Sequence, residues 1–314
     1  MTIAAKATKE KSVIWKRCVK ELVKNKYLYL MAFPVVLYYF VFAYLPMYGV
    51  IIAFQQFSPG RGIWGSEFIG FENFINFFNS FYFFRLLRNT VLISLYDLFW
   101  SFPAPIILAL LINEVRSRHF KSTVQTVTYM PFFISLVVVC GIIIDFSLPY
   151  GFINDVLVLF GRERVNLLGR PDYFRTIFIA SNIWQTIGFS SIIFLAAISA
   201  IDQELYEAAV IDGANRIRQT LHITIPSISA TILILLILRV GNMLNVSFEK
   251  IILLYNPITF EVADVISSFV YRRGLLHFDF GYSAAVGLFN SVINFILLIA
   301  ANSASKKFSG SSLW

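Results

Sequence analysis

The sequence has few charged residues, cysteines and histidines. Only 14% of its 314 residues are charged, whereas a typical soluble domain has about 25%. The two cysteines, Cys18 and Cys140, lie far apart without CxxC spacing, and the three histidines are scattered along the chain. These shortages argue against a soluble globular domain, a disulfide framework and a metal site.

Motifs that carry catalysis are also lacking. The sequence holds no Gly-Lys dipeptide, so the phosphate-binding pattern GxxxxGK[ST] is absent. Neither GxSxG nor HExxH occurs, and no pair of carboxylates stands at a spacing typical of acid–base catalysis. We therefore expect a chain that is not an enzyme and that binds no ATP, cofactor or metal ion of its own.

Hydrophobic residues dominate instead, at 58% of the chain, and the mean hydropathy is +0.71. A bilayer core requires a helix of about 20 apolar residues. The first apolar stretch is too long for a signal-peptide core, so we interpret it as a retained span. The sequence predicts an all-α, polytopic membrane protein with six transmembrane helices, near residues 28–54, 88–112, 124–148, 174–199, 226–246 and 282–303.

The positive charge is concentrated at the N-terminus. The net charge is +8, and eight of the 26 basic residues fall within the first 26 positions. Basic residues beside a first span indicate the cytoplasmic side and favour anionic lipid, rather than nucleic acid, as their partner. We predict a basic cytoplasmic arm over 1–27, either an interfacial amphipathic helix or a solvated tail, a membrane domain over 28–303, and a cytoplasmic tail over 304–314.

A short polar loop over 200–226 separates two of the apolar stretches. It begins with helical spacing around the Glu-Ala-Ala sequence at 207–209. Gly213 stands where that helix would end, because glycine tolerates the left-handed conformation that closes a helix. Pro226 opens the next apolar run, which suits a first helical turn. We expect a short helix, a turn and re-entry into the membrane, although an ordinary amphipathic loop is the alternative.

The spacing E-A-A-x3-G-x9-I-x-[L]-P, with Ile225 at the leucine position, resembles the signature of the membrane subunits of ATP-binding-cassette (ABC) importers. The resemblance implies a type I (MetI-like) permease fold in the bacterial inner membrane. It also implies partners: a second permease subunit, two ATPase subunits that bind ATP and Mg, and an extracytoplasmic solute-binding protein. In that family the loop contains a coupling helix that docks on the ATPase, which assigns this role to Glu207, Ala208, Ala209, Asp212, Gly213, Ile223 and Pro226.

Polar side chains inside the predicted spans are candidates for a translocation pathway. An ionisable residue at membrane depth, such as Asp97, is a functional candidate, or it pairs with another helix, for which Arg239 is a possible partner. Interhelical hydrogen bonding is the competing explanation for the amides. Arg239 is followed by two asparagines at i+3 and i+6, broadly one helix face. The candidates are Asp97, Asn182, Trp184, Gln185, Arg239, Asn242, Asn245, Asn290 and Asn294.

The stretch 238–250, the Tyr-Asn-Pro sequence at 255–257 and the closing Ser-Leu-Trp at 312–314 resemble one branch of the ABC permeases. That branch contains permeases for complex sugars, including an alginate importer. The resemblance implies ATP-driven import of an oligosaccharide or polysaccharide by alternating access, with an alginate-like acidic saccharide as the favoured cargo. An ABC permease for a non-sugar solute, a secondary transporter driven by an ion gradient and a membrane-embedded enzyme remain alternatives.

Overall fold

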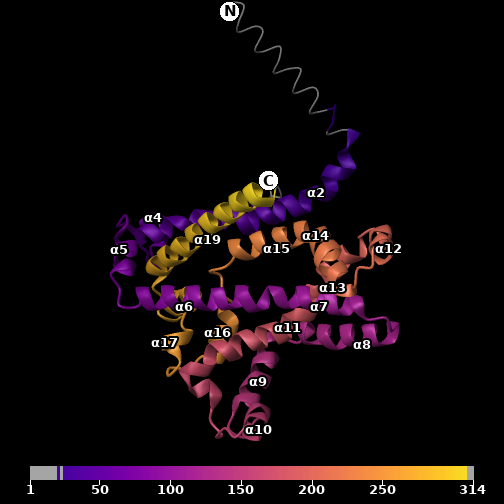
Figure 1. Cartoon of the computed structure of the whole chain (residues 1–314). Coiled ribbons are helices and arrows are strands. Elements are labelled where there is room, and N and C mark those ends of the chain that lie inside the picture. The colour runs from indigo at the N-terminus through magenta and orange to yellow at the C-terminus, as the bar shows by residue number, and fades with distance from the viewer. Residues whose placement is uncertain (1–19, 22–23, 310–314) are drawn as a thin grey trace, which may run out of the picture.

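The computed structural model describes residues 20–21 and 24–309, and helices dominate this part of the chain (Figure 1). Most of the arm predicted over 1–27 and residues 310–314 of the tail lie outside the described residues, so both remain predictions. The all-α prediction is confirmed. The helices are α2 (Lys26–Tyr39), α3 (Leu45–Met47), α4 (Gly62–Gly65), α5 (Glu72–Phe78), α6 (Phe83–Tyr96), α7 (Pro103–Glu114), α8 (Arg118–Tyr129), α9 (Leu136–Ser147), α10 (Phe152–Leu159), α11 (Pro171–Ser199), α12 (Gln203–Ile211), α13 (Arg216–Gln219), α14 (Ile225–Ser227), α15 (Ser229–Gly241), α16 (Phe248–Leu254), α17 (Phe260–Ala263), α18 (Ile266–Tyr271) and α19 (Phe280–Ser309).

Other regular structure is limited within residues 24–309. Two short strands, β1 (Gln55–Gln56) and β2 (Glu67–Phe68), pair antiparallel after the first span. Turns of 3-10 or π geometry join several helices. They are η1 (Phe40–Tyr44), η2 (Tyr48–Phe54), η3 (Asp97–Ser101), η4 (Met130–Phe133), η5 (Leu167–Gly169), η6 (Thr220–Thr224) and η7 (Arg272–Leu276).

The six predicted spans are present when a bent helix pair is taken as one span. Five helices are long and apolar enough to cross a membrane, and the pair Arg216–Ser227 and Ser229–Gly241, bent by 61°, supplies the sixth. The five single spans are Lys26–Phe54, Phe83–Glu114, Leu136–Leu159, Pro171–Ser199 and Phe280–Lys307.

The third span begins later than the predicted residue 124. It starts at Leu136, and the preceding residues form a separate amphipathic helix, α8, whose N-cap Ser117 accepts a hydrogen bond from the Phe120 N–H at 3.4 Å. The physical reason is polarity followed by proline: α8 is rich in hydroxyl and basic side chains, and Pro131 lies in the turn η4 that ends it.

The fifth span was also placed wrongly by the sequence. Its helix begins at Arg216 rather than at Pro226, because Asn215 caps it by accepting a hydrogen bond from the Arg218 N–H at 2.9 Å. Pro226 therefore lies within the bent pair, after the π turn η6 and just before the bend. The helix ends at Gly241, before the predicted residue 246.

The long helices pack against one another along the molecule. In Figure 1, α6 and α7 run in line across the molecule, and α19 lies obliquely above α6. α11 packs on α7, and α19 packs on α15 and η2. The coupling-loop helix α12 lies with α13 and the end of α8 at one end of the bundle, whereas α4 and α5 lie at the other end (Figure 1).

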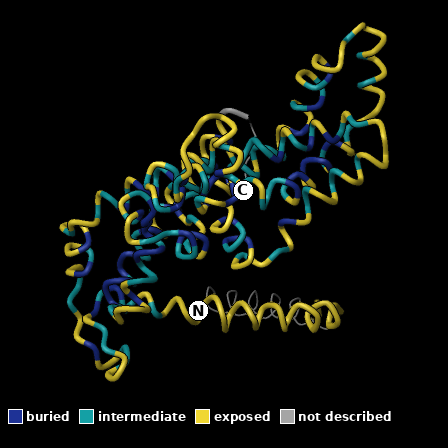
Figure 2. Tube along the Cα trace, turned by 90° about the horizontal axis from the view of Figure 1, so that it is seen from below, coloured by how far each residue is buried: buried dark blue, intermediate teal, exposed yellow. Residues whose placement is uncertain are grey.

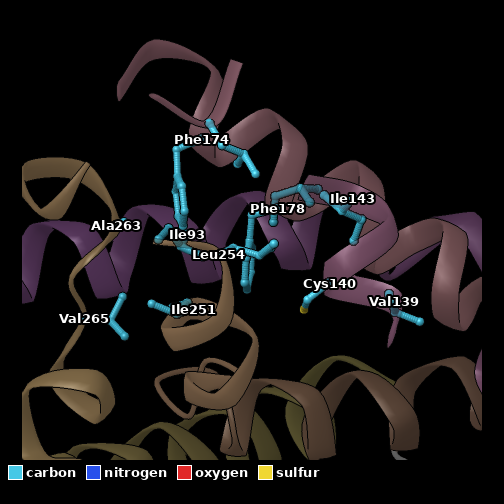
Figure 3. Packing of buried hydrophobic residues seen from close by; sticks show 12 residues of the cluster. Ile93, Val139, Cys140, Ile143, Phe174, Phe178, Ile251, Leu254, Ala263 and Val265 are labelled. Carbon is cyan, nitrogen blue, oxygen red and sulfur yellow. The ribbon is translucent and has the colours of Figure 1, made fainter. Parts of the chain in front are cut away.

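The apolar core forms where the segment between the fifth and sixth spans folds back into the bundle. Buried side chains from α6, α9, α11 and α16 meet in one cluster (Figure 3). Ile251 and Leu254 of α16 are buried there, beside Cys140 of α9 and Phe178 of α11. Because α16 is only seven residues long, this packing, rather than helix propensity, holds it in place.

Close backbone approach fixes α11 against α8. A Cβ atom on Gly188 would lie 2.1 Å from the carbonyl oxygen of Thr128, so only glycine fits at this crossing. The neighbouring ring of Phe189 stacks on Phe132 with 3.9 Å between centroids. By contrast, α2 has no buried residue, and Figure 2 shows this exposed helix set apart from the rest of the molecule.

Candidate functional site

The predicted short helix with its glycine turn is present as α12. The Asp202 carboxylate caps its start by accepting a hydrogen bond from the Glu204 N–H at 3.0 Å. Gly213 has a φ of 74°, and the Ala214 N–H returns to the Ala209 carbonyl at 2.8 Å. This is the closure by which a left-handed glycine ends a helix.

The side chains of this loop present an accessible surface. Glu207, Ala208, Asp212 and Gly213 are exposed, as is Pro226. Ala209 and Ile223 are half-buried. No residue of α12 is buried, so most of the surface of this helix is open.

A groove of about 580 Å³ lies beside α12. Glu207, Val210 and Ile211 line it from α12, and Arg216 and Gln219 line it from α13. Val210 and Ile211 are 63% and 86% exposed. Apolar side chains that protrude in this way from a polar loop are typical of a docking surface for another protein.

Contacts tie α12 to the fifth span. The Tyr206 hydroxyl hydrogen-bonds the Thr224 hydroxyl at 2.9 Å, and the Gln219 side-chain amide donates to the Ala214 carbonyl at 2.9 Å. Thr224 and Gln219 are buried. Displacement of α12 would therefore be transmitted to the helix pair that leads to Arg239.

A second cavity, of about 250 Å³, lies between the second, fourth and fifth spans. Five of the nine pathway candidates line it: Asp97, Asn182, Arg239, Asn242 and Asn245. The sequence placed them on three separate spans, and the fold brings them to one polar space.

An ion pair crosses this cavity. The Arg239 guanidinium bonds the Asp97 carboxylate, and the Asn182 side-chain amide donates to the other Asp97 oxygen at 2.7 Å. The side chain of Asp97 is 18% exposed and that of Arg239 is 45% exposed. The pairing that the sequence left open is therefore present, and part of the arginine still faces the cavity.

Asn245 joins the cavity to the sixth span. Its side-chain oxygen accepts hydrogen bonds from the side-chain amides of Asn290, at 2.9 Å, and Asn294, at 3.1 Å. Its own amide donates to the Asn242 side-chain oxygen at 3.2 Å. Asn290 and Asn294 are buried behind Asn245 and do not line this cavity.

The expectation of one helix face for Arg239, Asn242 and Asn245 is wrong. Because α15 ends at Gly241, the two asparagines lie in the irregular segment that follows the helix. They still face the cavity, since the backbone bonds of that segment and the Asn294 side chain, which accepts from the Leu244 N–H at 3.0 Å, hold it in place.

Trp184 and Gln185 do not line the cavity. Trp184 follows Asn182 by two residues on α11, and each residue turns an α-helix by about 100°; Gln185, three residues after Asn182, is nearer to the Asn182 face but is not among the lining residues either. Trp184 thus points to a face nearly opposite that of Asn182, where it is 45% exposed. Thr186, four residues after Asn182, shares its face and lines the cavity instead.

The sequence interpretation missed Lys250. This lysine is 1% exposed, and its ammonium has no hydrogen-bond partner among the described residues. The Nζ atom lies 5.7 Å from the ring centroid of Phe178, a residue that lines the cavity. The apolar residues after it, from Ile251 to Leu254, are the one local signal of burial.

It also missed Asp264, which is fully buried between the fifth and sixth spans. Its two oxygens accept hydrogen bonds from Arg272 at 2.6 and 3.1 Å, and its backbone carbonyl accepts from the Asn89 side chain at 3.1 Å. Burial lowers the pKa of Arg272, but the hydrogen bonds and charge of Asp264 outweigh it and raise that pKa. This network anchors the 260–276 segment to α6.

Comparison with known families matches the model "Binding-protein-dependent transport system inner membrane component" over residues 101–310. Protein LplB of Bacillus subtilis (strain 168) is 44% identical over 98% of this chain and 96% of its own length. The polygalacturonan/rhamnogalacturonan transport system permease protein YteP of the same organism is 45% identical over 93% of this chain and 92% of its own length.

A solved structure has the same fold. It is a crystal structure of a bacterial ABC transporter involved in the import of the acidic polysaccharide alginate, and a chain of it matches with a TM-score of 0.86 and 42% identity. The match covers 93% of this chain and 99% of that chain. A second crystal structure contains the bacterial alginate ABC transporter with an alginate pentasaccharide-bound periplasmic protein, at 41% identity and a TM-score of 0.86.

Proposed function

We infer that this chain, which belongs to the family of inner membrane components of binding-protein-dependent transport systems, forms half of the translocation pathway of an ATP-driven importer. The family's members are permease subunits and not the ATPases of their transporters. The six spans agree with a multi-pass permease.

The proposed cargo is an acidic oligosaccharide or polysaccharide, with alginate-like chains as the favoured class. The names of the similar permease from Bacillus subtilis and of the alginate transporter support this class. The cavity adds chemical support, because its amides suit sugar hydroxyls and Arg239 suits a carboxylate.

We propose that a second permease subunit completes the pathway, that two ATPase subunits bind ATP and Mg, and that an extracytoplasmic binding protein delivers the saccharide. This chain itself would bind no cofactor and no nucleic acid. The proposed location is a bacterial inner membrane, in contact with lipid, with both termini in the cytoplasm. An even number of spans and the basic N-terminal arm support this orientation.

The observation that carries the proposal is the capped helix α12 with its open face. We propose that it docks on the ATPase. Glu207 and Asp212 would offer exposed carboxylates to basic groups, Ala208 and Ala209 would permit close approach, and Gly213 makes the turn.

Alternating access then follows from the connections of the loop. Closure of the ATPase dimer would move α12, and the bond between Tyr206 and Thr224 would pass this motion to the fifth span. Arg239 stands near the far end of that span, in the ion pair with Asp97. The same motion would therefore open or close the cavity around its charged pair.

The test is Gly213→Asp in the complete importer reconstituted in proteoliposomes. A residue with a side chain is strained at a φ of 74°, and an added carboxylate would disturb the docking turn. We expect ATP hydrolysis to continue while saccharide uptake per ATP falls about tenfold, an effect of roughly 1.4 kcal/mol on coupling.

The matched control is Gly161→Asp, since Gly161 is also exposed, has a φ of 75° and lies far from α12 in the sequence. This control should retain coupled uptake. Normal saccharide-dependent transport by the Gly213 variant would refute the docking role.

Co-purification separates an ABC permease from a secondary transporter. A tagged full-length chain should retain an ATPase subunit through detergent extraction, and uptake should require ATP. A chain that transports saccharide with an ion gradient and no ATPase would contradict the proposal.

A further inference from the structure

Lys250 is the buried charged group for which the pathway described so far has no role. It lies on α16 next to Ile251, which belongs to the apolar cluster that α9 and α11 also form and that includes Phe178 (Figure 3). A buried ammonium without a partner is costly, because it has lost its hydration. No described residue forms a hydrogen bond with the Lys250 ammonium, so this buried charge has no anion bonded to it.

The Lys250 ammonium lies directly behind the wall of the charged cavity. Phe178 forms part of that wall, with its ring centroid 5.7 Å from the Nζ atom, and Ser247, three residues before Lys250, also lines the cavity. Burial lowers the pKa of Lys250 to about 8, and the charges of Cys140 and Asp97 act against that shift. The lysine is thus electrostatically part of the cavity without lining it.

The charges of this group do not balance. Asp97 and Arg239 are the ionisable groups among the residues that line the cavity, and they form one ion pair. With Lys250 behind the wall, two positive charges face one negative charge, which leaves one positive charge in excess. One carboxylate brought into the cavity would balance the set.

We propose that Lys250 determines specificity for acidic saccharides, by supplying the positive charge that a uronate carboxylate balances when it enters the cavity. This inference rests on the proposed function as a saccharide permease. The uronate carboxylate would bind the exposed part of the Arg239 guanidinium. Arg239 would then neutralise Asp97 less completely, and the positive charge of Lys250 would stabilise the Asp97 carboxylate. A neutral saccharide has no carboxylate and therefore cannot balance the excess positive charge.

The experiment uses proteoliposomes that contain the complete importer and two probes of equal length. The probes are a mannuronate trisaccharide and its carboxyl-reduced, neutral counterpart. The uptake of each probe by a variant is divided by its uptake by the unmodified chain, which cancels the selectivity of the binding protein.

Lys250→Met keeps the length and apolar stem of the side chain and removes the charge. We expect it to lower uptake of the acidic probe about tenfold, since a desolvated charge has lost its compensation, and to change uptake of the neutral probe less than about twofold. Lys250→Arg keeps the charge and should retain most of the acidic uptake.

A charge-restoring double variant excludes a merely structural role. Lys250→Met combined with Asp97→Asn again has one positive charge, on an Arg239 that no longer has an anionic partner. Acidic uptake should recover toward the unmodified level. If the methionine prevents assembly, Lys250→Gln, which keeps a polar group and also removes the charge, provides the test with the same two expected ratios.

Three results would overturn the role of Lys250 without contradicting saccharide transport. They are an equal loss of uptake for both probes in Lys250→Met, no loss of uptake for either probe, and no recovery of acidic uptake in the double variant. Uptake of the neutral probe alone by the unmodified chain would also overturn it. Failure of the unmodified importer to carry either probe would instead count against the proposed function itself.

Discussion

The coupling end and the charged cavity are built from different kinds of contact. The two ends of the helix α12 are closed by bonds between residues that are near in sequence, Asp202 with Glu204 and Ala209 with Ala214, although Arg216 of α13 also reaches the distant Glu114 at 3.4 Å. In the cavity, Asp97 bonds Asn182, 85 positions away, and Arg239, 142 positions away. The α12 helix is closed by its own local bonds, whereas the cavity exists only while three spans stay together.

This difference implies that α12 moves as a rigid unit, whereas the cavity changes when the spans around it move. The α12 helix can move as a unit, because its capping bonds travel with it. The cavity bonds connect different helices, so any relative movement of those helices must lengthen or exchange them. We therefore expect substitutions in the cavity to affect access and stability together, and substitutions in α12 to affect coupling and the local stability of α12 without changing the cavity.

The largest effect should come from breaking the interhelical ion pair with Arg239→Met. The variant leaves the mostly buried Asp97 carboxylate with Asn182 as its remaining hydrogen-bond partner, and it removes the cation that faces the cavity. We expect uptake of an acidic trisaccharide to fall about a hundredfold. Adding Asp97→Asn should restore the thermal stability of the complex but not the uptake; restored uptake would contradict this role for Arg239.

Next in size is Gly188→Ala, which tests whether the cavity depends on how closely α11 packs against α8. The added Cβ would lie 2.1 Å from the Thr128 carbonyl oxygen, so one helix must shift. We expect a loss of about 2–3 kcal/mol in stability, typical of overpacking, measured as a lower melting temperature of the purified complex. Gly287→Ala, where the added atom meets nothing within 4 Å, is the control and should be nearly neutral.

Asn245→Leu should have a smaller effect that is still confined to the cavity. It removes the oxygen that accepts from Asn290 and Asn294, leaving two buried amides without that partner. The expected cost is about 1–2 kcal/mol, with reduced uptake and unchanged coupling ratio. Asn242→Leu, which removes a single bond, should cost less; a reversed order would show that Asn245 does not join the two spans.

The smallest effect should come from Asp202→Ala, which tests whether the stability of α12 is independent of the cavity. Loss of the N-cap destabilises a helix by about 1 kcal/mol, and the bond lost is local to α12. We expect faster amide hydrogen exchange in Gln203–Ile211 with unchanged exchange around Asn182, and a modest fall in coupling. Asp202→Ser should keep the cap, and faster exchange at both places would contradict the independence of the two regions.

The same contrast explains how much the sequence could predict. Hydropathy predicted six spans, and the Glu-Ala-Ala sequence with Gly213 predicted α12 with its turn, because these signals lie within one element. The start of the fifth span was missed although its cap, Asn215, is also local, since the polar residues after it resemble loop. Hydropathy outweighed the cap in that interpretation.

Residues whose environment depends on distant partners could not be predicted in the same way. Asp97 and Arg239 were recognised as unusual, but their pairing requires the fold. A lysine between two spans suggests an exposed loop, and only the return of α16 into the core buries Lys250. Trp184 was selected by residue type, and its position relative to Asn182 on α11 excludes it from the cavity.

The π turn η3 makes the length of the second span as important as its composition. Asp97 opens this five-residue turn, and α7 continues from it at Pro103. A π turn holds one more residue than an α turn, and one residue rotates a helix by about 100°. Deleting a single residue within 97–101 would therefore turn either Asp97 away from Arg239 or α7 away from α11, even if every cavity residue were kept. In homologous chains, a one-residue gap at this turn should mark a different cavity more reliably than a substitution does.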